Sequence, residues 1–351
     1  MKARLRRNLP DEILKPASAG EIWVSVLGAV LIVVAVNAGA ISFLKYHSMN
    51  RGPILIRDKW TRLLTAGQPV DWLILGDSSG NSAVLPRVLR ARLGASSLNL
   101  CTIGWFSAVG DVWMLETYLA RFGPPKGVLI VHAFDTWQGD VDKSLLAHVP
   151  LPWGFWRKFE PSVALDRGEI FELFLTRYVP LYSQNRTLSD LFHFHWKGFM
   201  RRLPLDEAGY MAYEANPDKV EAASKSYLEG IVKKEFQFSV SSQRALKQLT
   251  VLAEKYDFDV FLADGPIYEG LYRQKAFFQY VSKVRKTLHS IVSKSRRLHY
   301  LSRLSIVFPK GQMESADHVI YSAAMVYTNR ICDEIAAQVP GIVSQVRNHT
   351  S

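Results

Sequence analysis

Residues 72–78 read Trp-Leu-Ile-Leu-Gly-Asp-Ser, and this stretch decides the fold class. Four consecutive apolar residues, Trp72–Leu75, are typical of a short strand that is buried on both faces. Gly76 and Asp77 then favour a turn, and helical spacing follows over 83–92 until Gly94 ends it. A buried strand that leads into a helix in this way indicates an α/β protein with a parallel sheet.

The alternation of strand and helix continues towards the C-terminus. The first part predicts strand 97–101, helix 109–120 and the almost wholly apolar strand 127–134. After a break the pattern predicts helix 241–255, strand 259–263, helix 272–294, a weaker strand 298–301 and helix 322–338. We therefore expect one α/β domain over 70–340 with right-handed crossovers, followed by a tail at 341–351. The aromatic and basic stretch at about 150–238 has no clear strand, which predicts a helical insertion.

The N-terminal region differs from the rest of the chain. A basic leader, 1–21, precedes the uncharged run 22–44, which at about 1.5 Å per residue is long enough to cross a hydrocarbon core of roughly 30 Å. The run favours a single-pass membrane helix with a cytoplasmic N-terminus, and we expect 45–69 to be a juxtamembrane linker. A cleaved signal peptide, with Ala38-Gly39-Ala40 as its cleavage site, is the alternative.

Composition limits the classes of partner and cofactor. Hydrophobic residues make up 48% of the chain and charged residues 21%, which is typical of a globular protein. The net charge of +11 suits anionic lipids or acidic envelope polymers, and no nucleic-acid-binding motif accompanies it. His193 and His195 lack a completing ligand cluster, so we expect no metal and no cofactor. Cys101 and Cys332 are expected to be two separately buried thiols, because nothing in their spacing requires a bridge.

Two segments carry residues with the chemistry of a serine esterase. Ser78 directly follows the first strand, and ligands of parallel sheets bind beyond the carboxyl ends of strands. A serine nucleophile needs a base, which His318, just before the last predicted helix, can provide. We predict that Ser78 and His318 lie together at one edge of the sheet.

These segments resemble the SGNH hydrolase superfamily. The resemblance extends to a membrane-anchored bacterial branch with alginate O-acetyltransferase J-type proteins and the D-alanyl-lipoteichoic acid biosynthesis protein D. Gly76-Asp77-Ser78 is similar to the nucleophile motif, and Asn99–Gly104 to the motif that supplies an oxyanion glycine. His318 is followed at matching spacing by Ala323-Ala324 and Tyr327-Thr328. The resemblance implies a flavodoxin-like, three-layer α/β/α domain after one membrane helix.

The resemblance also implies an activity and a location. Ser78 would attack an acyl, in particular acetyl, ester of an anionic cell-envelope or extracellular polysaccharide, with His318 as base. The N–H groups of Ser78 and Gly104 would hold the oxyanion. The domain would face the periplasm from the bacterial inner membrane, and a multi-pass membrane O-acyltransferase would be its partner.

Three positions depart from the pattern of that superfamily. Asp135 stands about where an oxyanion asparagine is usual, Ser315 where the acid is usual, and Ile320 where another asparagine is usual. We expect Asp317 to orient His318, with Glu314 and Asp135 as the alternative acids. The departures also leave open a catalytically inactive partner that scaffolds a polysaccharide export or modification complex.

Overall fold

The parallel sheet expected from the sequence is confirmed in the computed structural model. The structure describes residues 18–44, 51–159, 163–185, 188–189, 203–232, 235–304 and 306–340. Five parallel strands, β1 (Trp72–Gly76), β2 (Ser97–Asn99), β3 (Gly127–His132), β4 (Asp259–Asp264) and β6 (Leu298–Tyr300), pair in the order β2-β1-β3-β4-β6. This is the flavodoxin-like order. A separate pair joins β5 (Ile267–Tyr268) to β7 (Val307–Phe308).

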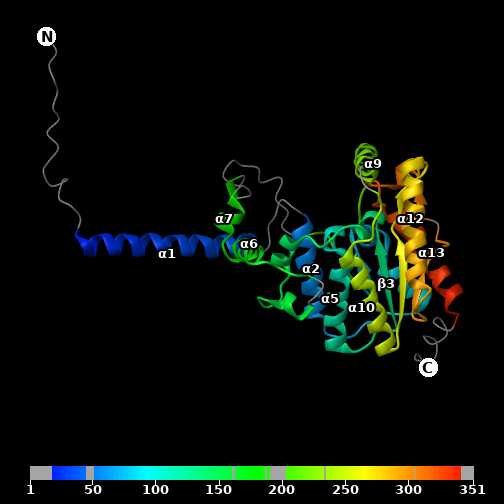
Figure 1. The fold of residues 1–351 in the computed structure, drawn as a ribbon, viewed down its shortest axis with the longest axis horizontal. Coiled ribbons are helices and arrows are strands. Elements are labelled where there is room, and N and C mark those ends of the chain that lie inside the picture. The colour runs from blue at the N-terminus through cyan, green and yellow to red at the C-terminus, as the bar shows by residue number, and fades with distance from the viewer. Residues whose placement is uncertain are drawn as a thin grey trace, which may run out of the picture.

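Helices cover both faces of this sheet. After β1 come α3 (Ser78–Ala83) and α4 (Pro86–Leu93), which pack with α13 (Tyr321–Gln338). The helices α5 (Ser107–Phe122) and α10 (Val240–Tyr256) pack with each other, and α12 (Lys275–Val292) connects β4 to β6. Because crossovers between parallel strands are right-handed, α4 and α13 lie on one face and α5, α10 and α12 on the other. The result is the expected three-layer arrangement (Figure 1).

The strand order fixes where the chain reverses direction across the sheet. From β1 it turns outward to β2, and from β2 it crosses back to β3. Helices therefore leave β1 and β3 on opposite faces, and parallel sheets generally bind ligands at the carboxyl ends of two such strands. The register of β1 and β3 pairs Gly76 with Val131, so the next residues, Asp77 and His132, lie opposite each other at that edge of the sheet.

Two local predictions differ in detail from the structure. The helix predicted over 83–92 is present as α4 but begins at Pro86, because Leu85 before this proline is extended. The 45–69 stretch is not a plain linker, since α2 (Arg51–Thr65) occupies most of it. Ile56, Trp60 and Leu63 lie on one face of α2 and are fully buried in the main core.

A buried lysine attaches α2 to the segments that follow β1 and β2. The Nζ atom of Lys59 donates to Oδ1 of Asn81 at 2.6 Å, to the carbonyl and Oδ1 of Asn99 at 2.9 and 3.2 Å, and to the carbonyl of Gly209. Burial lowers the pKa of Lys59 to about 7. Since Asn81 belongs to α3, this cation fixes the helix that starts at Ser78.

The N-terminal helix α1 (Ala19–Leu44) extends away from the α/β body (Figure 1). It is long and apolar enough to cross a membrane, and it is the one such helix among the described residues. Next to its C-terminal end lie α6 (Arg167–Tyr178) and α7 (Pro180–Ser183), the first helices of the insertion. The insertion also contains α9 (Pro217–Val232), which packs on α12, and the short α11 (Glu269–Tyr272) follows β5. His193 and His195 lie outside the described residues.

Candidate active site

Gly76 permits the sharp turn that brings Ser78 to the carboxyl edge of the sheet. Its φ is +131°, and an added Cβ would lie 1.9 Å from the carbonyl oxygen of Val131. No side chain fits there, so the motif requires glycine. Asp77 then caps α3 by accepting a hydrogen bond from the amide of Ser79, 2.8 Å away. Ser78 is half-buried, whereas Asp77 and Ser79 on either side of it are buried.

Asp77 is the centre of a buried hydrogen-bond network. Its Oδ2 atom accepts from the amide of Ala133 at 2.7 Å, from Oγ1 of Thr136 at 2.6 Å, and lies 3.3 Å from Nδ1 of His132. Burial alone would raise the pKa of this carboxyl, but the bonds and charge of His132 and the hydroxyls of Ser79 and Thr136 lower it well below its ordinary value. Asp77 is therefore an ionised structural acceptor.

His132 is a buried cation between two carboxylates. Its Nε2 atom lies 2.6 Å from Oδ2 of Asp111, opposite the contact with Asp77. Burial lowers its pKa, yet the charge and hydrogen bond of Asp111, followed by those of Asp77, raise it to about 10. Asp111 also accepts from the amide of Gly76 at 2.9 Å, so the network holds the turn before Ser78. A protonated His132 with both nitrogens occupied has no capacity to act as a base.

Gly104 lies against the same turn. It begins the 3₁₀ helix Gly104–Phe106 after β2, and a Cβ on it would meet Oγ1 of Thr136 at 3.1 Å and Cβ of Asp77 at 3.9 Å. Within the described part of the chain, the amide N–H groups of Ser78 and Gly104 have no hydrogen-bond acceptor. Two backbone donors are thus available at this edge.

His318 reaches the site from the loop before α13. Its Nδ1 atom lies 2.9 Å from Oδ1 of Asp317 and 2.5 Å from Oγ of Ser315. Burial lowers the pKa of His318, but Asp317 raises it more, with smaller effects from Glu314 and Asp77, and the net direction is upward. Among the described residues, Nε2 of His318 has no hydrogen-bond partner, so this nitrogen is available to exchange a proton.

The two remote segments converge. Thr328 of α13 donates to the carbonyl of Ala83 at 2.9 Å and accepts from the amide of Leu85 at 3.0 Å, which ties α13 to the end of α3. The carboxylate of Asp77 also contributes to the pKa shift of His318. The helix α3, which begins at Ser78, and the helix α13, which begins three residues after His318, are therefore packed together.

The three candidate acids have different partners. Asp317 contacts His318, whereas Glu314 forms an ion pair with Lys219. Asp135 accepts a hydrogen bond from the hydroxyl of Tyr227, 2.9 Å away, and the same hydroxyl lies 3.3 Å from Oδ2 of Asp317. Desolvation by neighbouring atoms, followed by the charge of Asp317, raises the pKa of Asp135 to about 6.

The insertion supplies two residues that sequence reasoning missed. Tyr227 of α9 bridges Asp135 and Asp317, and the ring of Tyr213 lies 5.5 Å from the ring of His318. A cavity of about 390 Å³ borders this corner and is lined in part by Asp135, Tyr227 and Tyr280. The insertion thus forms one wall beside the candidate site.

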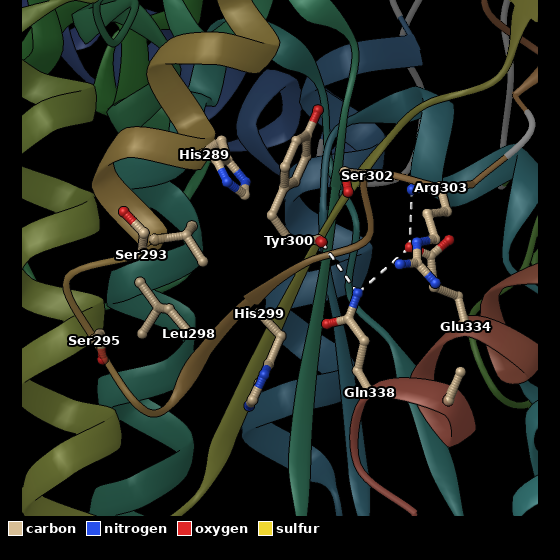
Figure 2. A pocket seen from close by; sticks show the side chains of 12 residues that line it. His289, Ser293, Ser295, Leu298, His299, Tyr300, Ser302, Arg303, Glu334 and Gln338 are labelled. Carbon is tan, nitrogen blue, oxygen red and sulfur yellow. Dashed lines mark hydrogen bonds between the residues drawn. The ribbon is translucent and has the colours of Figure 1, made fainter.

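A second cleft lies at the β6 edge of the sheet, between α12 and α13 (Figure 2). Its volume is about 430 Å³, and neither Ser78 nor His318 lines it. Gln338 donates to the carbonyl of Tyr300 at 3.1 Å, and His299 is bonded to Asp259 at 2.8 Å. These bonds satisfy polar groups at the edge of the sheet.

Cys101 and Cys332 are both buried and free, as expected from their spacing. Burial raises the pKa of each thiol. Neither cysteine is a nucleophile at neutral pH, which leaves the half-buried hydroxyl of Ser78 as the candidate nucleophile after β1.

Comparisons with known proteins give a limited result. No protein-family model matches the sequence, and no curated protein matches it. A solved structure from Streptococcus pneumonia, named "putative platelet activating factor", is 10% identical, with a TM-score of 0.38. The alignment covers 85% of this chain and 97% of that chain. A likeness at this TM-score carries no argument about fold or function, so both rest on the chain's own geometry.

Proposed function

We propose that this chain is a membrane-anchored serine acyltransferase or ester hydrolase. What supports the proposal is that α3, which begins at the half-buried Ser78, packs on α13, which follows His318. Ser78 and Gly104 offer two unbonded N–H groups, and Nδ1 of His318 is held by Asp317. These are the parts of a serine-histidine-acid site, which is recognised by its geometry and roles. The chain would act on acyl, in particular acetyl, esters of a cell-envelope or extracellular polysaccharide.

The chemistry proceeds through an acyl-serine. Nε2 of His318 takes the proton of the Ser78 hydroxyl while Oγ attacks the ester carbonyl, and the N–H groups of Ser78 and Gly104 hold the oxyanion. The tetrahedral intermediate collapses, and the protonated His318 gives its proton to the departing alcohol oxygen. An acceptor alcohol or water then repeats these steps in reverse and releases Ser78.

Location and partners follow from the anchor and from the resemblance of the motifs. With α1 across the bacterial inner membrane and the N-terminus in the cytoplasm, the domain faces the periplasm. The net charge of +11 suits an anionic polysaccharide. A multi-pass membrane O-acyltransferase would deliver the acyl group, and the chain would transfer it.

Ser78→Ala tests the nucleophile. We expect a fluorophosphonate probe to label the full-length protein and the matched Ser226→Ala protein, but not Ser78→Ala, and acylation of the polymer in cells to fall with the labelling. Equal labelling of all three proteins would exclude Ser78. The thermal unfolding midpoint of each variant establishes that it is folded.

A non-catalytic scaffold of a polysaccharide export or modification complex is the second candidate. Asp135 favours it, because a carboxyl with a pKa of about 6 is mostly ionised at neutral pH and would repel an oxyanion. On this hypothesis the probe labels nothing, and Ser78→Ala leaves polymer modification unchanged while removal of the whole chain abolishes it.

A further inference from the structure

The insertion carries a group of exposed aromatic side chains on one surface. Three of them, Phe171, Phe174 and Tyr178, recur at helical spacing along α6, and Phe171 is 59% exposed. Trp153 lies 6.0 Å from Phe174 and 5.5 Å from Tyr178 between ring centroids, and Phe174 lies 5.3 Å from Tyr178. With Tyr182 of α7, 67% exposed, they form what we call the aromatic patch. A contiguous exposed patch of this kind marks an interaction surface.

The aromatic patch adjoins the membrane helix. Nδ2 of Asn37 in α1 donates to the carbonyl of Tyr178 at 2.6 Å, and the amide of Leu181 lies 3.4 Å from Oδ1 of Asn37. The side chain of the one strongly polar residue in the apolar run 22–44 is thereby satisfied by the junction of α6 and α7. Figure 1 shows both helices beside the C-terminal part of α1.

The depth of this contact follows from helix geometry. Asn37 precedes Leu44 by about two turns, or roughly 10 Å of rise. The 26 residues of α1 span about 39 Å, some 9 Å more than a hydrocarbon core of about 30 Å. Whichever end of α1 carries the excess, Asn37 lies between the boundary of the hydrocarbon and about 10 Å inside it. Its partner, the carbonyl of Tyr178, lies at the same depth.

We propose that the aromatic patch inserts into the interfacial zone of the bilayer that α1 spans. Aromatic rings favour this zone, where their apolar faces meet acyl chains and their polar atoms meet water. The contact between Asn37 and Tyr178 favours lipid, rather than a protein, as the partner of the patch, because it places the patch at the level of the bilayer. The inference rests on the proposed membrane anchor, and it holds for either orientation of α1.

Insertion would fix the orientation of the domain as well as its distance from the membrane. Leu173 on the opposite face of α6 is buried in the main core, and Glu169 of the same helix is 2.6 Å from Lys143. A single helix leaves the attached domain free to rotate about it, whereas a second contact beside that helix removes this freedom. The candidate site would then keep one fixed orientation relative to the bilayer.

Nitroxide labels on the full-length protein in liposomes test this inference. The labels are placed at Phe171→Cys, Tyr182→Cys and the control Phe278→Cys, which replaces an apolar residue of α12 that is 50% exposed. The native cysteines are buried and give little background. Power saturation measures the collision of each label with oxygen, which is enriched in lipid, and with a nickel chelate, which stays in water.

We expect labels at 171 and 182 to collide with oxygen several-fold more than with the nickel chelate, and the label at 278 to show the reverse. If the labels at 171 and 182 collided more with the nickel chelate than with oxygen, as expected for position 278, the inference would be overturned. Patch labels shielded from both reagents would assign the patch to a protein contact, which also overturns it. A label at Val30→Cys in the middle of α1 measures separately whether α1 lies in lipid. This distinguishes failure of the proposed membrane anchor from failure of the proposed insertion of the patch.

Discussion

Nδ1 of His318 lies 2.9 Å from Oδ1 of Asp317, the residue that precedes it in sequence. Serine-histidine-acid sites bring the acid from any part of the chain, since the geometry alone matters. Here a neighbour occupies that position, and Ser315, which stands where the acid was expected, donates its hydroxyl to Asp317 at 2.9 Å. Asp317 can therefore take the place of the acid that the SGNH pattern has at position 315.

Asp317→Asn should lower the activity and move its pH dependence. The negative charge of Asp317 raises the pKa of His318 above its ordinary value, so removal of that charge lowers this pKa. A base acts in its neutral form, hence the acid limb of the kcat/KM profile should shift to lower pH. The maximum should fall between about 10-fold and 10⁴-fold. Glu235→Gln is the matched control, since Glu235 is in an exposed ion pair with Lys283 and does not contact His318. An unshifted acid limb in Asp317→Asn would reject the role of Asp317.

His132 should make stability fall as the pH rises. Its pKa is about 10 in the folded protein and about 6.5 when unfolded, so the folded state binds the extra proton between these values. Its contribution is fully present below about pH 6.5 and is lost as the pH rises towards 10. The difference in thermal midpoint between the native protein and His132→Gln should therefore shrink over this window. Should the variant not fold, imidazole NMR of the native protein should still show a charged His132 at pH 8; a neutral ring would contradict the prediction.

Lys59→Met should destabilise the whole domain. Methionine fills the space but leaves Oδ1 of Asn81 and the carbonyls of Asn99 and Gly209 without their buried donor. A buried unsatisfied polar group costs about 1–3 kcal/mol, so we expect a loss of at least about 3 kcal/mol. The thermal midpoint should fall by roughly 6–12 °C. Lys283→Met, which removes an exposed ion pair with Glu235, should change it by less than about 3 °C. Equal midpoints for both variants would contradict the role assigned to Lys59.

The sheet was predictable because its strands carry their own signal. The strand 127–132 is buried at every position, and so is 72–76, which is why continuous apolar runs located them. Helix α2 also had a signal, since Ile56, Trp60 and Leu63 recur at helical spacing. A buried lysine with four oxygen acceptors cannot be recognised from sequence, because its partners come from three distant segments.

The site was predictable only in part for the same reason. Ser78, Gly104 and His318 follow or precede regular elements, so the ends of those elements indicated where they lie. The pairing of Asp111 with His132 depends on how α5 packs against β3, and the position of Tyr227 depends on how α9 folds back over the sheet. Local spacing contains no information about such contacts.

The attachment of α2 has a practical consequence for anyone who wants the soluble part by itself. A truncation at residue 70, where the α/β pattern starts, would discard Trp60 and Leu63 and expose the apolar surface that they cover. Such a fragment would aggregate, whereas one that starts at Arg51 would retain every buried side chain of α2. For the same reason, α2 and the α/β body form one folding unit.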